Sequence, residues 1–248
     1  MLDKNKSSPL YKQLKNIIKD KIESGEWETD KQLPSERELV EQYKVSRITV
    51  RQAIDLAERE GLVKRVHGVG TFVAQSKIKQ ELTEFNTFQS TLQQLGLLAS
   101  TKLLKSSVET SNFQLAKLLD IGVMDKVIHL ELIGYGDSDP IVYYSSYFSF
   151  DFGKKMQSVA EKALNDNIPF STLDLYTNNN NLGFQPTHVE QTFEAMAADE
   201  NLSKILNVDL HFPLFHVTSV VYYDKLPLEY KETFYRGDKY KFFITRQM

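Results

Sequence analysis

The stretch from Leu33 to Val73 constrains the fold most strongly, because two helix starts and a hairpin follow one another closely. Ser35 is a favourable N-cap, and Glu38 three residues later completes a capping box, so a short helix is predicted to begin here and end near Lys44. After a tight turn, Ser46 begins a second helix. Its apolar residues recur at i, i+3, i+4 and i+7 and predict one buried face: Val50, Ala53, Ile54 and Ala57.

A β-hairpin is predicted directly after Gly61, which ends the second helix. Residues 62–66 alternate apolar and basic side chains, and residues 71–74 can pair back on them. The two glycines at the tip tolerate positive φ and allow close approach to a sugar-phosphate backbone. Hydrogen-bond donors near the tip are Lys64, Arg65 and His67. Helix, turn, helix and hairpin together predict a winged helix-turn-helix.

The second helix places Arg47, Thr49 and Arg51 at its outward N-terminal end, which enters the major groove in helix-turn-helix proteins. Arginine can donate two hydrogen bonds to the O6 and N7 atoms of guanine. We therefore expect binding to double-stranded DNA. The alternative is a small helical packing domain with a solvated charged face. We disfavour it because caps, spacing, arginines and hairpin agree.

The charge distribution supports this expectation once the chain is divided. The net charge is −3, but residues 1–75 hold 14 Lys and Arg against 12 Asp and Glu, whereas the remainder holds 16 against 21. Five of the seven arginines also lie before residue 76. A modest local surplus of positive charge suits a few well-placed phosphate contacts.

Three segments of this region resemble the N-terminal domain of GntR-type bacterial transcription regulators: PLYKQLKNIIKDKIESGEW, LPSERELVEQYKVSRITVRQAI and HGVGTFV. The resemblance implies DNA contacts from Arg37, Arg47, Arg51, His67, Gly68 and Gly70, with Ser35 and Thr49 in support. Val69 departs from the family, which usually carries Lys or Arg at the tip. This substitution is expected to weaken a backbone or minor-groove contact.

Length and composition allow two soluble domains. The 248 residues are 41% hydrophobic and 25% charged, and the absence of cysteine excludes disulfides, thiolate metal sites and a cysteine nucleophile. No run approaches the roughly 20 apolar residues of a membrane span, and the first residues are polar, so a cytoplasmic location is expected. We predict a DNA-binding domain at 1–74, a linker at 75–81 and a second domain at 82–248, with no cofactor and no metal.

The second domain is predicted to be α+β, with a mostly antiparallel sheet and an internal repeat. Ser111 and Asp199 can each cap a short helix, and each helix is followed by two strands around an Asp-x-x-Pro turn. Aligning the turns superposes Tyr143 on Tyr230 and Phe148 on Tyr235.

The ending LEYKETFYRGDKYKF, the stretch FSTLDLY and the DSDP turn resemble the UTRA domain of the HutC branch of these regulators. This resemblance implies a fold similar to chorismate lyase and a small-molecule effector that is bound without turnover. By family position the pocket is expected to contain Phe85, Thr87, Tyr144, Ser171, His188, Glu229 and Tyr235. For each aromatic residue, core packing is the alternative role.

Two family positions argue against a phosphorylated effector. Relatives that bind phosphosugars have two arginines in the strand where this chain has Leu132 and Gly134, so the bidentate clamp for a phosphate is missing. An organic acid, a nucleoside-like or sugar-like compound and an acyl chain remain open. The expected protein is a homodimeric repressor, released from a palindromic operator by its effector.

Two other classes of protein are alternatives, an enzyme and a DNA-binding dimer without an effector. The five histidines lack metal-ligand spacing, and neither a phosphate loop nor a nucleophile motif occurs, which disfavours an enzyme. A lyase-like activity does not follow from fold alone. A DNA-binding dimer without an effector would leave the second domain serving dimerisation only.

Overall fold

The computed structural model describes residues 2, 8–74, 77–82, 87–177, 182 and 185–245. The chain forms two compact units, Met1–Lys77 and Ile78–Met248. No helix within the described ranges is both long enough and apolar enough to cross a membrane.

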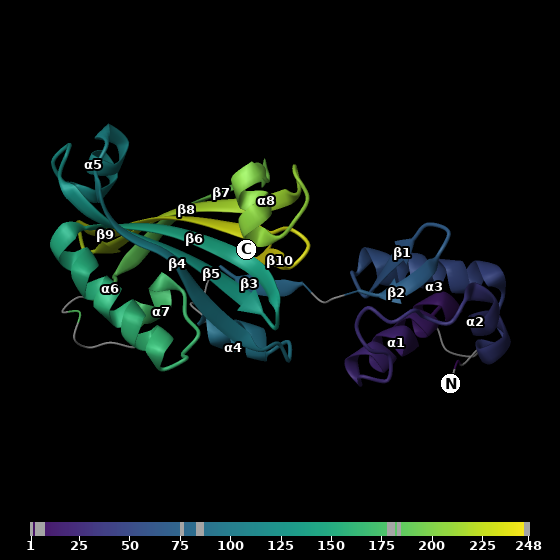
Figure 1. The fold of residues 1–248 in the computed structure, drawn as a ribbon. Coiled ribbons are helices and arrows are strands. Elements are labelled where there is room, and N and C mark those ends of the chain that lie inside the picture. Colours follow the sequence, from purple (N-terminus) through teal and green to yellow (C-terminus); the bar gives the residue numbers. More distant parts are fainter. Residues whose placement is uncertain are drawn as a thin grey trace. The chain divides into compact units, whose positions relative to one another are not determined.

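The first unit has three helices and a two-stranded hairpin (Figure 1): α1 (Leu10–Glu23), α2 (Glu36–Tyr43), α3 (Arg47–Arg59), β1 (Val63–Val66) and β2 (Gly70–Val73). The predicted buried face of α3 is confirmed, because Val50, Ala53, Ile54 and Ala57 all lie in the core. They pack with Leu14 and Ile18 of α1, Leu39 of α2, and Val63 and Val73 of the hairpin. The unit is therefore a winged helix-turn-helix.

The second unit is built on a six-stranded antiparallel sheet with the order β4-β5-β6-β9-β8-β7. These strands are β4 (Ala99–Thr110), β5 (Lys126–Gly136), β6 (Asp139–Ser149), β7 (His188–Ala197), β8 (Pro213–Tyr223) and β9 (Leu226–Arg236). The predicted α+β class with an antiparallel sheet is confirmed.

The predicted internal repeat is confirmed by the element boundaries. The unit of α5 (Phe113–Leu119), β5 and β6 recurs, at an offset of 87 residues, as α8 (Glu200–Leu206), β8 and β9. β6 and β9 pair antiparallel at the centre of the sheet, so the two copies meet there. One detail differs from expectation: Asn112, not Ser111, caps α5, because the Ser111 hydroxyl donates to the Gly122 carbonyl instead.

The repeat extends to side chains on one sheet face. His129 stacks on Tyr147 with ring centroids 4.1 Å apart, and His216 stacks on Phe234 at 4.6 Å. The members of these pairs differ by the same 87 positions. Helices α5 and α8 pack on this face, and each reaches the central strand of the other copy, α5 contacting β9 and α8 contacting β6.

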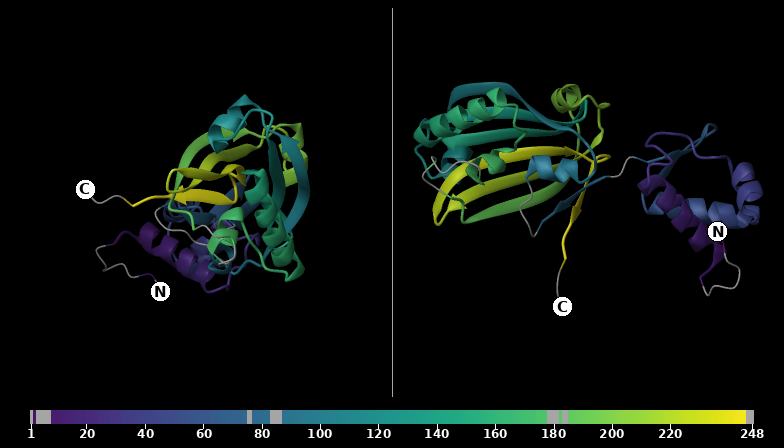
Figure 2. Two further views of the ribbon diagram at one scale, coloured as in Figure 1. Left: turned by 90° about the vertical axis from the view of Figure 1, so that its left-hand side faces the viewer. Right: turned by 90° about the horizontal axis from the view of Figure 1, so that it is seen from below.

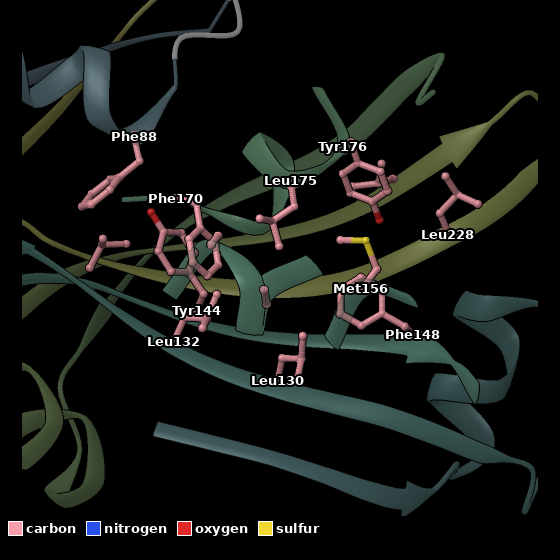
Figure 3. Packing of buried hydrophobic residues seen from close by; sticks show 14 of the residues in the cluster. Phe88, Leu130, Leu132, Tyr144, Phe148, Met156, Phe170, Leu175, Tyr176 and Leu228 are labelled. Atoms are coloured by element: carbon pink, nitrogen blue, oxygen red, sulfur yellow. The ribbon is translucent and has the colours of Figure 1, made fainter. Parts of the chain in front are cut away.

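The opposite face of the sheet carries the main core. Helix α6 (Phe150–Asn165) crosses it, and α4 (Phe88–Gln93) and α7 (Thr172–Thr177) lie on the same side, as Figure 2 shows. Side chains from strands and helices converge in this layer, among them Leu130, Tyr144, Met156 and Leu175 (Figure 3).

Residues 78–81, expected at the end of the linker, form a strand instead. This strand, β3 (Ile78–Glu81), pairs in parallel with β10 (Tyr240–Phe243), and Ile78 is only 2% exposed. The partner strand is about 160 positions away along the chain, so no local sequence pattern could predict the pairing. The end of the expected linker thus belongs to the second unit.

Candidate functional site

The helix-turn-helix is held by two side-chain caps. Ser35 Oγ accepts from the backbone N–H of Glu38, and the Glu38 carboxylate accepts from the Ser35 N–H at 2.7 Å, which confirms the capping box. The Ser35 hydroxyl also donates to the Glu38 carboxylate at 2.8 Å, and this bond, together with that from the Ser35 N–H, lowers the pKa of Glu38. Ser46 Oγ accepts from Thr49 N at 3.1 Å and begins α3. The caps set the angle at which the second helix leaves the turn.

The N-terminal end of α3 presents basic and apolar side chains to solvent. Arg47 and Arg51 are exposed, and Arg51 Nε lies 2.9 Å from Glu36 Oε2 of α2. Arg37 is exposed on α2 and pairs with Glu41 on the same helix. The Thr49 hydroxyl lies 2.9 Å from that of Ser46, so it supports the cap.

Ile48 is a surface residue that the sequence reasoning overlooked. It is 69% exposed at the N-terminal end of α3. An apolar side chain at this place in a recognition helix can contact the methyl group of thymine. Its break from the buried periodicity of α3 is the signal that could have identified it.

The wing tip is shaped by its two glycines. Gly68 has φ of +74°, and a Cβ atom at Gly70 would collide with the Gln32 side chain. Gln32 Nε2 donates to the Val69 carbonyl at 3.0 Å and so braces the tip from outside the hairpin. His67 and Val69 are exposed, Val69 by 60%.

The two cations near the wing are tied to acidic partners. Lys64 pairs with Asp30, and Arg65 pairs with Asp55 and Glu58 of α3. Arg65 therefore joins the wing to the second helix. The side chains left most open toward a ligand are Arg47 and His67, for which no acidic partner occurs within the described part of the chain.

The second unit contains a cavity of about 540 Å³, within the usual size range for small-molecule sites. Residues of β3, α4, β6, α7, β7, β8, β9 and β10 line it. Of the seven predicted effector residues, five line this cavity: Thr87, Tyr144, Ser171, His188 and Tyr235. Phe85 lies outside the described residues.

Glu229 does not line the cavity, contrary to its predicted place in the pocket. Its side chain is 0% exposed, and its Oε1 accepts from Thr172 Oγ1 at 2.5 Å. Burial, and then the nearby charge of Glu229, raises the pKa of Tyr176. The carboxylate is thus held behind the cavity wall, between two side chains of α7.

The sequence reasoning missed most of the lining, including two buried charged residues, Lys231 and Asp174. Lys231 is 3% exposed and donates to Thr172 Oγ1 at 3.3 Å, while Asp174 accepts from the backbone N–H groups of Phe88 in α4 and of Ser171 just before α7. Burial raises the pKa of Asp174 despite these hydrogen bonds. Period-two alternation along β9 places Lys231 on the same face as Glu229 and Tyr235, so this pattern could have found it.

The two positions that the family resemblance predicts for a phosphate-binding arginine pair, Leu132 and Gly134, have no room for a long polar side chain. Leu132 is a core residue, and a Cβ atom at Gly134 would approach the Phe88 ring to 2.7 Å. The Phe88 ring therefore occupies the space that a longer side chain would need. Within the described residues no group of three or more His, Asp or Glu side chains could hold a metal ion.

Comparisons with known proteins find a family match for each of the two units. Residues 10–73 match the family described as bacterial regulatory proteins, gntR family, and residues 94–241 match the UTRA domain. The HTH-type transcriptional repressor NagR of Bacillus subtilis (strain 168) is 28% identical, covering 97% of this chain and 96% of its own length. The uncharacterized regulator YurK of the same organism is 31% identical, covering 90% and 88%.

Among solved structures, PhnF from Mycobacterium smegmatis is similar over both units. Its TM-score is 0.68 at 25% identity, and the match covers 96% of this chain and 99% of that chain. The chain therefore belongs to the gntR family of DNA-binding transcription regulators, and its second unit is a UTRA domain.

Proposed function

We propose that this protein is a repressor that binds a palindromic operator as a homodimer and leaves it when a small molecule occupies the cavity of the second unit. The proposal rests on β3, which both lines the cavity and directly follows the DNA-binding unit in the chain. Its residues Gln80 and Glu81 line the cavity, and the strand begins where the DNA-binding unit ends, after Lys77. Repression is suggested by relatives such as NagR, which is named a transcriptional repressor.

The DNA contacts are assigned to exposed groups of the first unit. Arg47 and Arg51 reach base edges or adjacent phosphates from α3, and Arg37 contacts the backbone from α2. His67 and the glycines Gly68 and Gly70 form the wing contact. Ser35 and Thr49 act through the helix caps that orient these groups.

A homodimer follows from the size of one recognition module. A single helix-turn-helix reads only a few base pairs, and twofold symmetry places two such helices about 34–36 Å apart, one turn of B-DNA. The second units are the proposed source of the dimer contact. In such a dimer, the DNA-binding units of the two chains are connected to each other through the contact between the second units.

The coupling route is proposed to run through the β3–β10 pair. Tyr240 and Phe242 of β10 line the cavity together with β3 residues, so a bound molecule would contact both strands. A shift of β3 is passed along the chain to the DNA-binding unit and changes the freedom or spacing of the two units in a dimer. Couplings of this kind are typically about 1–3 kcal/mol, or roughly 5- to 150-fold in affinity.

The effector is proposed to be non-phosphorylated. Leu132 and Gly134 offer no guanidinium, and Phe88 closes the space at Gly134. The protein should bind the effector without turning it over.

Selection from random DNA duplexes tests the proposal. The full chain should enrich sequences with two inverted half-sites, and light scattering of the complex should show two chains per duplex. A metabolite screen for release of the selected duplex then tests effector control. Asymmetric enriched sites bound by one chain would refute the dimer, and a screen whose binders leave DNA affinity unchanged would refute the coupling.

A further inference from the structure

Lys231 is a buried cation on the wall of the cavity. It lies near the middle of β9, 3% exposed, opposite Ser146 of β6 and Ser219 of β8. Burying an ammonium group is costly unless acceptors or an opposite charge compensate it. A lysine at this depth is therefore expected to have a specific partner.

The described residues provide only part of that compensation. Lys231 Nζ donates to Thr172 Oγ1 at 3.3 Å, and its ammonium lies 6.0 Å from the centre of the Tyr144 ring. An ammonium has three donors, so one hydroxyl acceptor leaves two N–H groups for other partners. No carboxylate comes within 4.0 Å of Nζ anywhere in the part of the chain that the structure describes.

The two nearby carboxylates are already engaged. Glu229 accepts from the same Thr172 hydroxyl on the side away from the cavity. Asp174 Oδ2 accepts from the N–H groups of Phe88 and Ser171. The charge of Lys231 acts on Asp174, but burial outweighs it and raises the pKa of that carboxyl. Both carboxylates thus have hydrogen-bond partners other than Lys231, although Glu229 Oε2 has none among the described residues.

The lining also indicates how much negative charge the cavity accepts. Within the described lining Lys231 is the one Lys or Arg side chain, beside the two carboxylates of Glu81 and Asp174, and no guanidinium is present. A phosphate dianion is best bound by a bidentate guanidinium or several cations. The single ammonium can therefore pair with at most one carboxylate of a ligand. The rest of the wall, with Thr91, Gln191 and the ring of Tyr235, can contact hydroxyl groups or an apolar body.

We infer that Lys231 is a specificity-determining residue that binds a single carboxylate of the effector, which makes the effector a small monocarboxylic acid. This inference rests on the proposed effector site and narrows its ligand. Thr172 is a positioning residue, because its hydroxyl joins Lys231 to Glu229 and fixes the ammonium at the wall. Glu229 acts through Thr172 and does not touch the ligand.

The test compares acids with their neutral amides on the full-length protein. Acetate, benzoate and D-glucuronate are titrated against acetamide, benzamide and D-glucuronamide at equal ionic strength, with binding read by calorimetry and thermal shift. At least one acid should bind wild type roughly 10- to 100-fold more tightly than its amide, because a hydrogen-bonded charge pair is lost with the amide.

Lys231→Met and Lys231→Gln should abolish that preference, and Gln keeps a polar group if Met perturbs folding. Lys225→Met is the matched control, since Lys225 is exposed in the turn between β8 and β9 and lies outside the lining. The inference is overturned if no acid is preferred by wild type, or if the preference survives in both Lys231 variants.

Operator release separates this inference from the proposed function. An acid that binds through Lys231 without changing operator affinity would refute regulation and leave the ligand class standing. Release by a neutral compound, undiminished in both Lys231 variants, would refute the carboxylate site and leave regulation standing.

Discussion

Asp174 and Phe88 lie 86 residues apart in the chain, yet Asp174 Oδ2 accepts the Phe88 N–H at 3.1 Å. The same oxygen accepts from Ser171 N at 2.7 Å. One buried carboxylate of α7 thereby joins the first residue of α4 to the residue that precedes α7. Of the residues predicted for the pocket, Ser171 supplies one of these N–H groups and Thr87 directly precedes the other donor, Phe88. The hydrogen bonds of Asp174 therefore hold two segments of the cavity wall together.

Asp174→Ala should lower the free energy of unfolding of the second unit by about 1–3 kcal/mol, because two backbone N–H groups lose their acceptor in a buried place. Asp174→Asn should cost less, since the amide oxygen can still accept. Urea unfolding followed by far-UV circular dichroism measures both. Equal stability of Asp174→Ala and wild type would show that these hydrogen bonds contribute nothing.

Arg47→Ala and Arg51→Ala should each weaken operator binding by about 1–3 kcal/mol, as expected for loss of a base or adjacent phosphate contact. Folding should be intact, because both side chains are exposed and the Arg51–Glu36 pair is a surface ion pair of low worth. Fluorescence anisotropy with a selected duplex measures the loss. Arg59→Ala, in the last turn of α3, is the matched control and should bind like wild type.

Val69→Lys should tighten binding to all DNA sequences alike. Val69 is 60% exposed at the wing tip, and a cation there would neutralise about one more phosphate, which steepens the salt dependence by a slope of about 0.9. Titrations between 50 and 200 mM salt, as for typical protein–DNA complexes, measure the slope. Leu210→Lys adds the same charge on the second unit and should leave the slope unchanged. An unaltered slope in Val69→Lys would place the tip away from phosphates.

Glu109 should make the second unit sensitive to acid. Burial alone would raise the pKa of Glu109, but hydrogen bonds from Lys105, His129 and Ser107 outweigh it and hold the pKa at about 2, below its ordinary value of 4.5. A folded-state pKa below the unfolded value stabilises the protein above about pH 4.5, and this stabilisation is lost as the pH falls toward 2. With partial solvent screening the contribution is of the order of 1–2 kcal/mol.

Glu109→Gln should therefore be less stable than wild type at pH 6 and lose less stability between pH 5 and pH 3. Far-UV circular dichroism follows the sheet during urea unfolding, and Trp27 fluorescence reports the first unit separately. Glu161→Gln, on the exposed side of α6, serves as the control carboxylate. Parallel pH profiles for wild type and Glu109→Gln would contradict the assigned hydrogen bonds.

The features that followed from sequence alone are those whose physics is local. The caps at Ser35 and Ser46 each satisfy N–H groups within three residues, and the buried stripe of α3 repeats with the helical period, so both could be read directly. The internal repeat could also be predicted from the sequence, because each copy is formed by residues that are close together in the chain. Each copy is a helix and a hairpin with its own turn, and an aligned Asp-x-x-Pro pair marks both.

Tertiary structure decided what depends on contacts between distant segments. The pairing of β3 with β10 satisfies backbone groups far apart in the chain, so residues 78–81 looked like a polar linker. Alternation placed Glu229 and Lys231 on one face of β9, but only the position of Thr172 on α7 turns the carboxylate to the back of the wall and leaves the ammonium at the cavity. Burial and hydrogen-bond partners are properties of the packed chain, and they decide which of two charged neighbours can meet a ligand.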